Sequence, residues 1–170
     1  MNTGEKSSSA DNQQVSRENI SDDYFSGFVD GEGCFYIGFS KRGDLPIKWQ
    51  ILTEFHVSQN PGSKNVLEFF QKRLGCGYLK PNHPKSNSDK TWILCVKDKR
   101  DLREKVIPFF DQHPLHTTKQ RDYEIFKKVV RSIEKKRHLT KEGFRDIVEL
   151  VFSNTRVTKK RYYKADLLSF

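Results

Sequence analysis

The chain has 170 residues, a length that suits one domain with a core of ordinary size. Its 31 Lys and Arg outnumber 22 Asp and Glu, so the net charge is +9 and the pI is near 9.5. This excess favours a polyanionic partner such as nucleic acid. No apolar run reaches the ~20 residues of a membrane span, and the polar N-terminus lacks a secretory signal. We expect an intracellular protein, in a prokaryotic cytoplasm or within an organelle, with no membrane association.

The cysteines and the two ends of the chain set the domain organisation that we expect. Cys34, Cys76 and Cys95 lie far apart, and no Cys/His spacing suggests zinc, so reduced and mostly buried thiols are expected. Residues 1–18 are rich in polar residues without periodicity and predict a disordered tail. Residues 19–154 form the predicted domain. Residues 155–170 form a basic C-terminal tail that could add phosphate contacts.

A short helix with two unlike faces is predicted to begin after Ser21, a suitable N-cap. Its apolar face comprises Tyr24, Phe25, Phe28 and Val29. Its small and polar face comprises Ser26, Gly27, Asp30 and Gly31. A glycine inside a helix lowers its stability by about 0.5–1 kcal/mol relative to alanine. Close approach of a second helix would explain why this helix has both Gly27 and Gly31. Glu32 then lies where that contact ends. A solvated helix terminus with surface acids is the alternative.

Two strands with alternating apolar residues follow the helix and predict half of an antiparallel sheet. The residues expected to face the core are Phe35, Ile37, Phe39, Trp49, Ile51, Phe55 and Val57. The opposite face carries polar and basic side chains, which suits a sheet laid on nucleic acid. An ordinary solvated face would look much the same.

The remaining pattern completes an α+β order. Residues 64–74 predict a helix, residues 78–82 and 91–97 a second hairpin, and residues 101–110 another helix. A long helix follows Thr117 or Thr118, and an amphipathic helix covers residues 140–152. The order is helix, two strands, helix, two strands, then helices (αββαββα), with a four-stranded antiparallel sheet covered by helices on one face.

Several stretches resemble the LAGLIDADG homing endonucleases. The first is Phe25-Ser26-Gly27-Phe28-Val29-Asp30-Gly31-Glu32-Gly33, and the resemblance extends over roughly residues 21–150. In that family the motif helix packs against its twin, and the last acid of the motif binds the metals that cleave DNA. The resemblance implies that Glu32, with the Gly31 carbonyl, binds Mg²⁺, a site that Mn²⁺ or Ca²⁺ can also occupy.

Three further residues take catalytic roles by the same resemblance. Gln59, which follows the second strand, would orient a water near the metals. Lys119, at the start of the helix after the second hairpin, would lie near the scissile phosphate. Some relatives have a basic residue four positions after the glutamine, where this chain has Ser63. Either Lys64 takes that role or the enzyme lacks it.

The resemblance also implies the partners. The chain carries one copy of the motif, and one-motif members dimerise, so Ser26, Gly27, Asp30 and Gly31 would form the interface of a homodimer. The sheet would sit in the major groove of double-stranded DNA. Each dimer would cut a long pseudo-palindromic target and leave 3′ overhangs. Candidate DNA contacts are the outward residues Tyr36, Ser40, Arg42, Lys48, Gln50, His56, Lys80, Asn82 and Thr91.

Two other functions fit the same scaffold. An intron maturase would bind RNA and assist splicing, with or without DNA cleavage, although nothing in the sequence indicates RNA in particular. A transcription regulator would keep the fold and lose the metal site. The intact Glu32 favours the enzyme, because a pure binder has no need of a carboxylate beside DNA phosphates.

Overall fold

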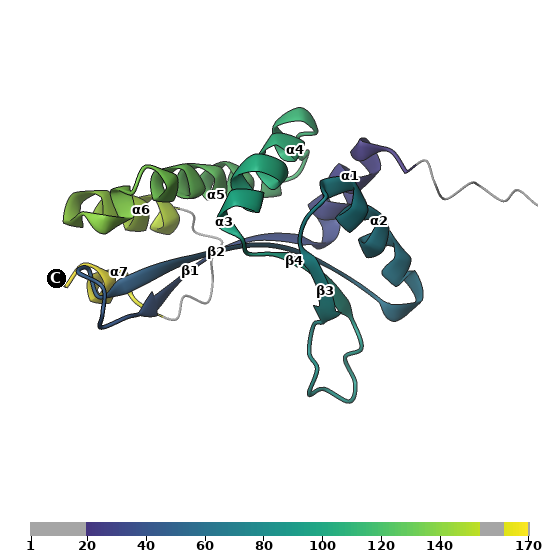
Figure 1. Ribbon diagram of the computed structural model, residues 1–170, viewed down its shortest axis with the longest axis horizontal. Coiled ribbons are helices and arrows are strands. Elements are labelled where there is room, and N and C mark those ends of the chain that lie inside the picture. Colours follow the sequence, from purple (N-terminus) through teal and green to yellow (C-terminus); the bar gives the residue numbers. More distant parts are fainter. Residues whose placement is uncertain (1–19, 154–161, 170) are drawn as a thin grey trace, which may run out of the picture.

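The computed structural model describes residues 20–153 and 162–169, and it shows a four-stranded antiparallel sheet with helices on one face (Figure 1). The first half comprises α1 (Asp22–Glu32), β1 (Gly33–Lys41), β2 (Trp49–Gln59), the 3₁₀ turn η1 (Pro61–Ser63), α2 (Lys64–Leu74), β3 (Tyr78–Pro81) and β4 (Trp92–Val96). The second half comprises α3 (Lys99–Asp101), the π-helical η2 (Leu102–Val106), α4 (Ile107–Gln112), α5 (Lys119–Glu134), the 3₁₀ turn η3 (Arg137–Leu139), α6 (Lys141–Phe152) and α7 (Lys164–Leu167). The predicted α+β order is confirmed.

The helix predicted at residues 101–110 is longer and contains a π-helical segment. The elements α3, η2 and α4 follow one another without a break, and the Ile107 amide donates to the Leu102 carbonyl, five residues back. Pro108 explains the wider turn, because it has no amide proton for the Glu104 carbonyl and its ring would clash there in a regular α-helix. The periodicity gave no sign of this local widening.

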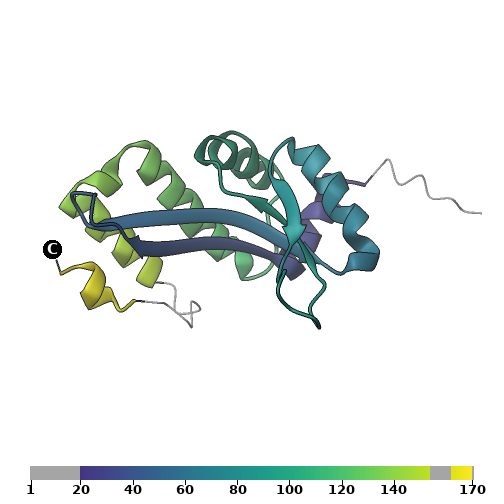
Figure 2. The ribbon, with the colours of Figure 1, turned by 60° about the horizontal axis from the view of Figure 1, so that its bottom comes forward.

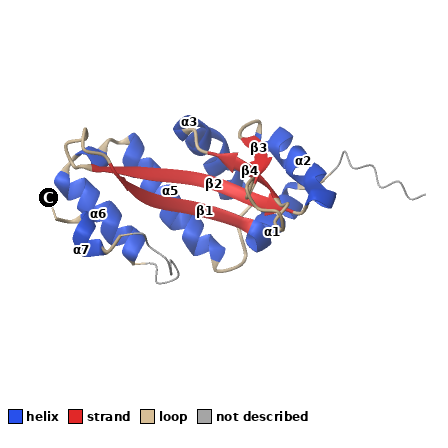
Figure 3. Cartoon of the chain, turned by 90° about the horizontal axis from the view of Figure 1, so that it is seen from below, coloured by secondary structure: helices blue, strands red, loops and turns tan. Residues whose placement is uncertain are grey.

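The sheet has the strand order β1-β2-β4-β3, and its register decides which residues share a face. Phe35 pairs with Phe55, and Phe55 pairs with Val96; these side chains turn toward the helices. Their neighbours Tyr36 and Glu54, which also pair, turn the other way. Figures 2 and 3, which bring the underside forward, show β1 and β2 in front of the helices. We call this uncovered side of the sheet the bare face.

Aromatic rings hold the sheet to the helices. Phe35 lies with its ring centroid 5.2 Å from that of Phe110 and 5.3 Å from those of Phe55 and Tyr123. Burial of such large apolar groups, with tilted or edge-on ring contacts, is a strong source of stability. A second cluster lies at the tip of the β1–β2 hairpin. Its residues include Ile47, Trp49, Ile51, Phe144, Val148 and Leu167.

The C-terminal segment contributes to that second cluster. Leu167 of α7 is completely buried, and the Tyr162 ring packs edge-on against Trp49 at 4.7 Å. Residues 162–169 therefore pack against the β1–β2 hairpin, although the sequence led us to expect a basic tail over residues 155–170. Residues 155–161 and the predicted disordered tail, residues 1–18, lie outside the described residues, and the domain boundaries stay predictions.

Two other expectations concern thiols and membranes. Cys76 and Cys95 are buried, Cys34 is half-buried, and all three are free thiols, as expected. Among the helices of residues 20–153 and 162–169, none is long and apolar enough to span a bilayer.

Candidate active site and nucleic-acid interface

Helix α1 presents a different face to solvent from the one that its sequence suggested. Phe25 and Val29 are buried as expected, but Ser26 is also buried, and its hydroxyl lies 3.0 and 2.9 Å from the His113 and Pro114 carbonyl oxygens, which can accept its proton. Ser26 therefore faces its own chain, which corrects its assignment to a dimer interface. Tyr24, placed on the apolar side, is 49% exposed.

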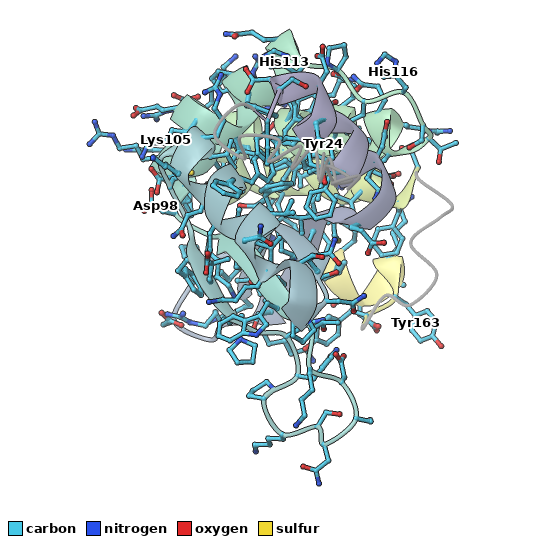
Figure 4. The ribbon with its side chains drawn as sticks, turned by 90° about the vertical axis from the view of Figure 1, so that its right-hand side faces the viewer. Tyr24, Asp98, Lys105, His113, His116 and Tyr163 are labelled. Carbon is cyan, nitrogen blue, oxygen red and sulfur yellow. The ribbon has the colours of Figure 1, made fainter. Side chains whose placement is uncertain are left out.

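The exposed α1 face consists of Tyr24, Gly27 and Gly31, flanked by the half-buried Phe28. These positions have the i, i+3, i+4, i+7 spacing of one helical stripe. A Cβ added at Gly27 or Gly31 would meet no atom within 4 Å, so this strip is open to a partner. Figure 4 views this side of the molecule, with Tyr24 near its middle and His113 and His116 near the top.

Asp30 binds the loop that leads into α5. Its carboxylate accepts hydrogen bonds from the amides of His116 (2.6 Å) and Thr117 (3.2 Å) and from the Thr117 hydroxyl (2.7 Å). Burial alone would raise the pKa of Asp30, but these bonds outweigh it and the pKa is lowered. Within the subunit the Asp30 side chain holds the start of α5 beside the end of α1. Its expected place at a dimer interface stays a prediction.

Lys119, the first residue of α5, reaches the end of α1. Its ammonium donates to the carbonyls of Val29 (2.9 Å) and Gly31 (3.2 Å) at the C-terminal end of the helix, where the helix dipole favours a cation. Burial lowers the pKa of Lys119, while the nearby Cys34, Asp30 and Glu32 oppose that change. Lys119, predicted to lie near the scissile phosphate, and the Gly31 carbonyl, predicted as a metal ligand, are thus in direct contact.

Glu32 is exposed at the last turn of α1, and no described residue hydrogen-bonds or ion-pairs with its carboxylate. Gly33 then turns the chain into β1; a Cβ there would lie 2.4 Å from Val29 Cγ1, so the turn requires glycine. An available carboxylate beside a backbone carbonyl provides the oxygen donors that Mg²⁺ prefers. Within the described residues, no three His, Cys, Asp or Glu side chains cluster as a metal site.

Gln59 and Lys64 lie at the same end of the sheet. Because β1 and β2 are antiparallel and Gly33 pairs with Val57, Gln59 ends β2 beside the point where α1 passes into β1. Gln59 also pairs with Trp92, and the Lys64 ammonium lies 4.2 Å from the Trp92 ring centroid. The fold thus gathers the four predicted catalytic residues at one end. Lys64 also pairs with Glu68 at 3.0 Å.

The predicted DNA contacts follow the bare face and its extensions. By strand register, Tyr36, Ser40, Gln50, His56 and Lys80 point away from the helices. Asn82 and Thr91 continue the β3–β4 ladder through a bond from the Asn82 amide to the Thr91 carbonyl. The bare face thus carries polar side chains along both hairpins, interrupted on β4 by the buried Ile93 and Cys95.

At the tip of the first hairpin, polar side chains are held by one another. Arg42 bonds the Asp44 carboxylate and donates to Gln50 Oε1 at 3.3 Å, while Lys48 donates to the Gly43 carbonyl. The Arg42 guanidinium lowers the pKa of Asp44 to about 2. Nearer α1, burial lowers the pKa of His56, which favours a neutral imidazole there.

A model of the LAGLIDADG endonuclease family matches residues 25–130, which include most of α1, the whole sheet and most of α5. The chain belongs to the LAGLIDADG endonuclease family. A relative in Schizosaccharomyces pombe, "Probable intron-encoded endonuclease Cox1-I1b", is 37% identical over 108 residues, which are 64% of this chain and 26% of that protein. The chain thus spans about a quarter of the length of this curated relative.

Solved endonuclease structures of two sizes resemble this chain. The homing endonuclease I-TnaI aligns with a TM-score of 0.77 and 34% identity, over 89% of this chain and 97% of that one. The meganuclease I-SmaMI, solved bound to uncleavable DNA, aligns with a TM-score of 0.74 and 27% identity, over 81% of this chain and 46% of that one. This chain thus resembles almost the whole of I-TnaI and about half of I-SmaMI.

Proposed function

We propose that this chain is one subunit of a homodimeric, site-specific double-strand DNA endonuclease that requires a divalent metal. The observation that carries this proposal is the exposed Glu32 carboxylate, which stands free at the end of an open glycine face and beside Lys119. A two-fold contact through that face would bring two such carboxylates together. The near-complete match in length to I-TnaI supports a subunit of this size.

Each residue of the site has a role in hydrolysis. The Glu32 carboxylate and the Gly31 carbonyl would hold Mg²⁺, which when bound activates a hydrolytic water and stabilises the leaving 3′ oxygen. Lys119, fixed on the helix carbonyls, would place its positive charge near the scissile phosphate. Gln59 would orient the water, and Lys64 would provide the charge that Ser63 lacks.

The bare face would bind the major groove of the target. The polar side chains on this face and the net charge of +9 are complementary to a DNA duplex. Two subunits related by a two-fold axis would recognise a pseudo-palindromic site and cut across the intervening minor groove, leaving 3′ overhangs. One relative is named as intron-encoded. We propose that this protein is also encoded in an intron and promotes homing of that intron.

Cleavage of a plasmid library tests the proposal. Purified protein with Mg²⁺ should make double-strand cuts at a small number of sites, and EDTA should abolish them. Glu32→Gln should bind the same duplex without cutting it, whereas Glu142→Gln, an exposed glutamate on α6, should cut normally. Absence of any metal-dependent cut, or normal cleavage by Glu32→Gln, would refute the assignment. Binding of intron RNA in preference to duplex DNA would instead favour a maturase.

A further inference from the structure

Glu54 is an unexpected residue on the bare face. It is the one acidic residue in strands β1 to β4, and it lies opposite Tyr36, which points away from the helices. A carboxylate facing a polyanion repels its phosphates, so its presence on a DNA-binding face calls for a compensating interaction. A base edge that donates a hydrogen bond provides one.

Glu54 is paired with a lysine on the same face. The Lys97 ammonium donates to Glu54 Oε1 at 2.8 Å, and this bond raises the pKa of Lys97. Continuing the register in which Phe55 pairs with Val96 places Lys97 directly across from Glu54. The Glu54 side chain is 20% exposed and that of Lys97 is 44% exposed, so both are accessible.

The ring of the neighbouring Tyr36 does not lie over this pair. A Cβ added at Gly38 would lie 2.2 Å from the Tyr36 hydroxyl oxygen, so the Tyr36 ring lies along β1 over Gly38. The ring thus extends toward the hairpin tip and away from Glu54 and Lys97. The side chains of the pair are held by β2 and by the end of β4, which gives a donor and an acceptor at fixed positions.

Their order matches one base pair in particular. In the major groove, guanine presents N7 and O6 as acceptors, and the paired cytosine presents its N4 amino group as a donor beside them. An ammonium next to a carboxylate is complementary to that sequence of groups. An A·T pair presents, in order, the adenine N7 acceptor, the adenine N6 donor and the thymine O4 acceptor. The ammonium would then have one acceptor in place of two, and a carboxylate at the position of thymine O4 would be repelled.

We propose that Lys97 and Glu54 together read one G·C base pair in each half of the target, with Lys97 on guanine and Glu54 on cytosine N4. This proposal rests on the proposed function and adds a specificity determinant to it. In the register, the pair lies closer to Glu32 than Ser40 and Gln50 do. The G·C pair therefore lies in the inner part of each half-site.

A duplex selection with randomised positions tests this proposal, using the full chain with Ca²⁺ in place of Mg²⁺ to prevent cleavage. The wild type should prefer G·C at one inner position of each half-site by about 10-fold or more. Glu54→Gln and, separately, Lys97→Met should reduce that preference to about 3-fold or less and leave the other positions unchanged. The double variant Glu54→Lys with Lys97→Glu should prefer the reversed pair, C·G.

Glu134→Gln is the matched control, because Glu134 pairs with Arg103 at 3.0 Å at the end of α5 in the helix layer. It should leave every preference unchanged. Failure of the wild type to select any duplex would overturn the proposed function. If a target is selected but Glu54→Gln and Lys97→Met alter affinity equally at all positions, the pair is a structural ion pair and only the specificity proposal fails.

Discussion

Replacing Gly27 by alanine gives opposite results for a monomer and for a dimer formed through the exposed α1 face. In the isolated subunit the added methyl meets no atom within 4 Å, so the full helix propensity gain applies. That gain is about 0.5–1 kcal/mol for glycine to alanine inside a helix. For a chain of this size, the melting temperature of a monomer should rise by about 1–4 °C.

In a dimer with helices packed closely through this face, the same methyl lies between two backbones. Overpacking of this kind costs about 1–3 kcal/mol for the interface as a whole. The dimer dissociation constant should therefore rise by about 5-fold to 150-fold. Gly31→Ala should behave in the same way, because its Cβ position is equally open in the single chain.

Sedimentation equilibrium and thermal unfolding, each over a hundredfold range of protein concentration, separate the two cases. Gly62→Ala is the control, since its Cβ would also meet nothing within 4 Å but it lies in η1, outside α1. The control should not alter the concentration dependence. If Gly27→Ala raises the melting temperature equally at all concentrations and the wild type sediments as a monomer with and without DNA, the homodimer proposal is wrong.

Three further changes test other parts of the structure. Leu167→Ala should destabilise the fold by about 2–5 kcal/mol in urea unfolding, because a fully buried leucine is lost, whereas Lys164→Ala should have little effect. Asp30→Asn should lower the melting temperature most near pH 7. Because the folded-state pKa of Asp30 is lowered, the carboxylate stabilises the fold above about pH 4, and this stabilisation is lost as the pH falls further. A drop in melting temperature of the same size at pH 7 and at pH 3 would contradict this reasoning. Gly38→Ala should displace the Tyr36 ring and weaken duplex binding in a titration while leaving the unfolding midpoint within about 2 °C of the wild type; unchanged binding would show that Tyr36 does not contact DNA.

The sequence predicted the fold well because its signals are local. Alternation separated the two faces of β1 and β2, and glycine pairs marked the helix ends, as at Gly75, whose φ of 65° is left-handed. It also predicted that Glu32 follows the glycine face. The catalytic and metal-binding roles stay predictions, although the fold gathers those residues at one end of the sheet.

The errors arose where tertiary contacts override helical periodicity. Ser26 was assigned to the exposed strip because it is small and polar, but two carbonyls in the loop before α5 bind its hydroxyl inside the chain. Tyr24 was predicted to be buried because it is aromatic, and nothing in residues 21–33 indicates that its side chain lies outside the core. The Glu54–Lys97 pair joins residues 43 positions apart, and strand parity would have indicated only that they share a face.

Under the proposed function, the length of the first hairpin has a consequence for the size of the DNA target. Strand β1 has 9 residues, and at about 3.3 Å per residue it extends about 30 Å. A B-form duplex lying along it advances about 3.4 Å per base pair, so one subunit can follow about nine base pairs. A two-fold pair would cover about twice that distance plus the central cleavage step. The length of the strands thus limits how many base pairs the sheet can contact. A longer target would require a longer hairpin or DNA contacts from segments beyond the sheet.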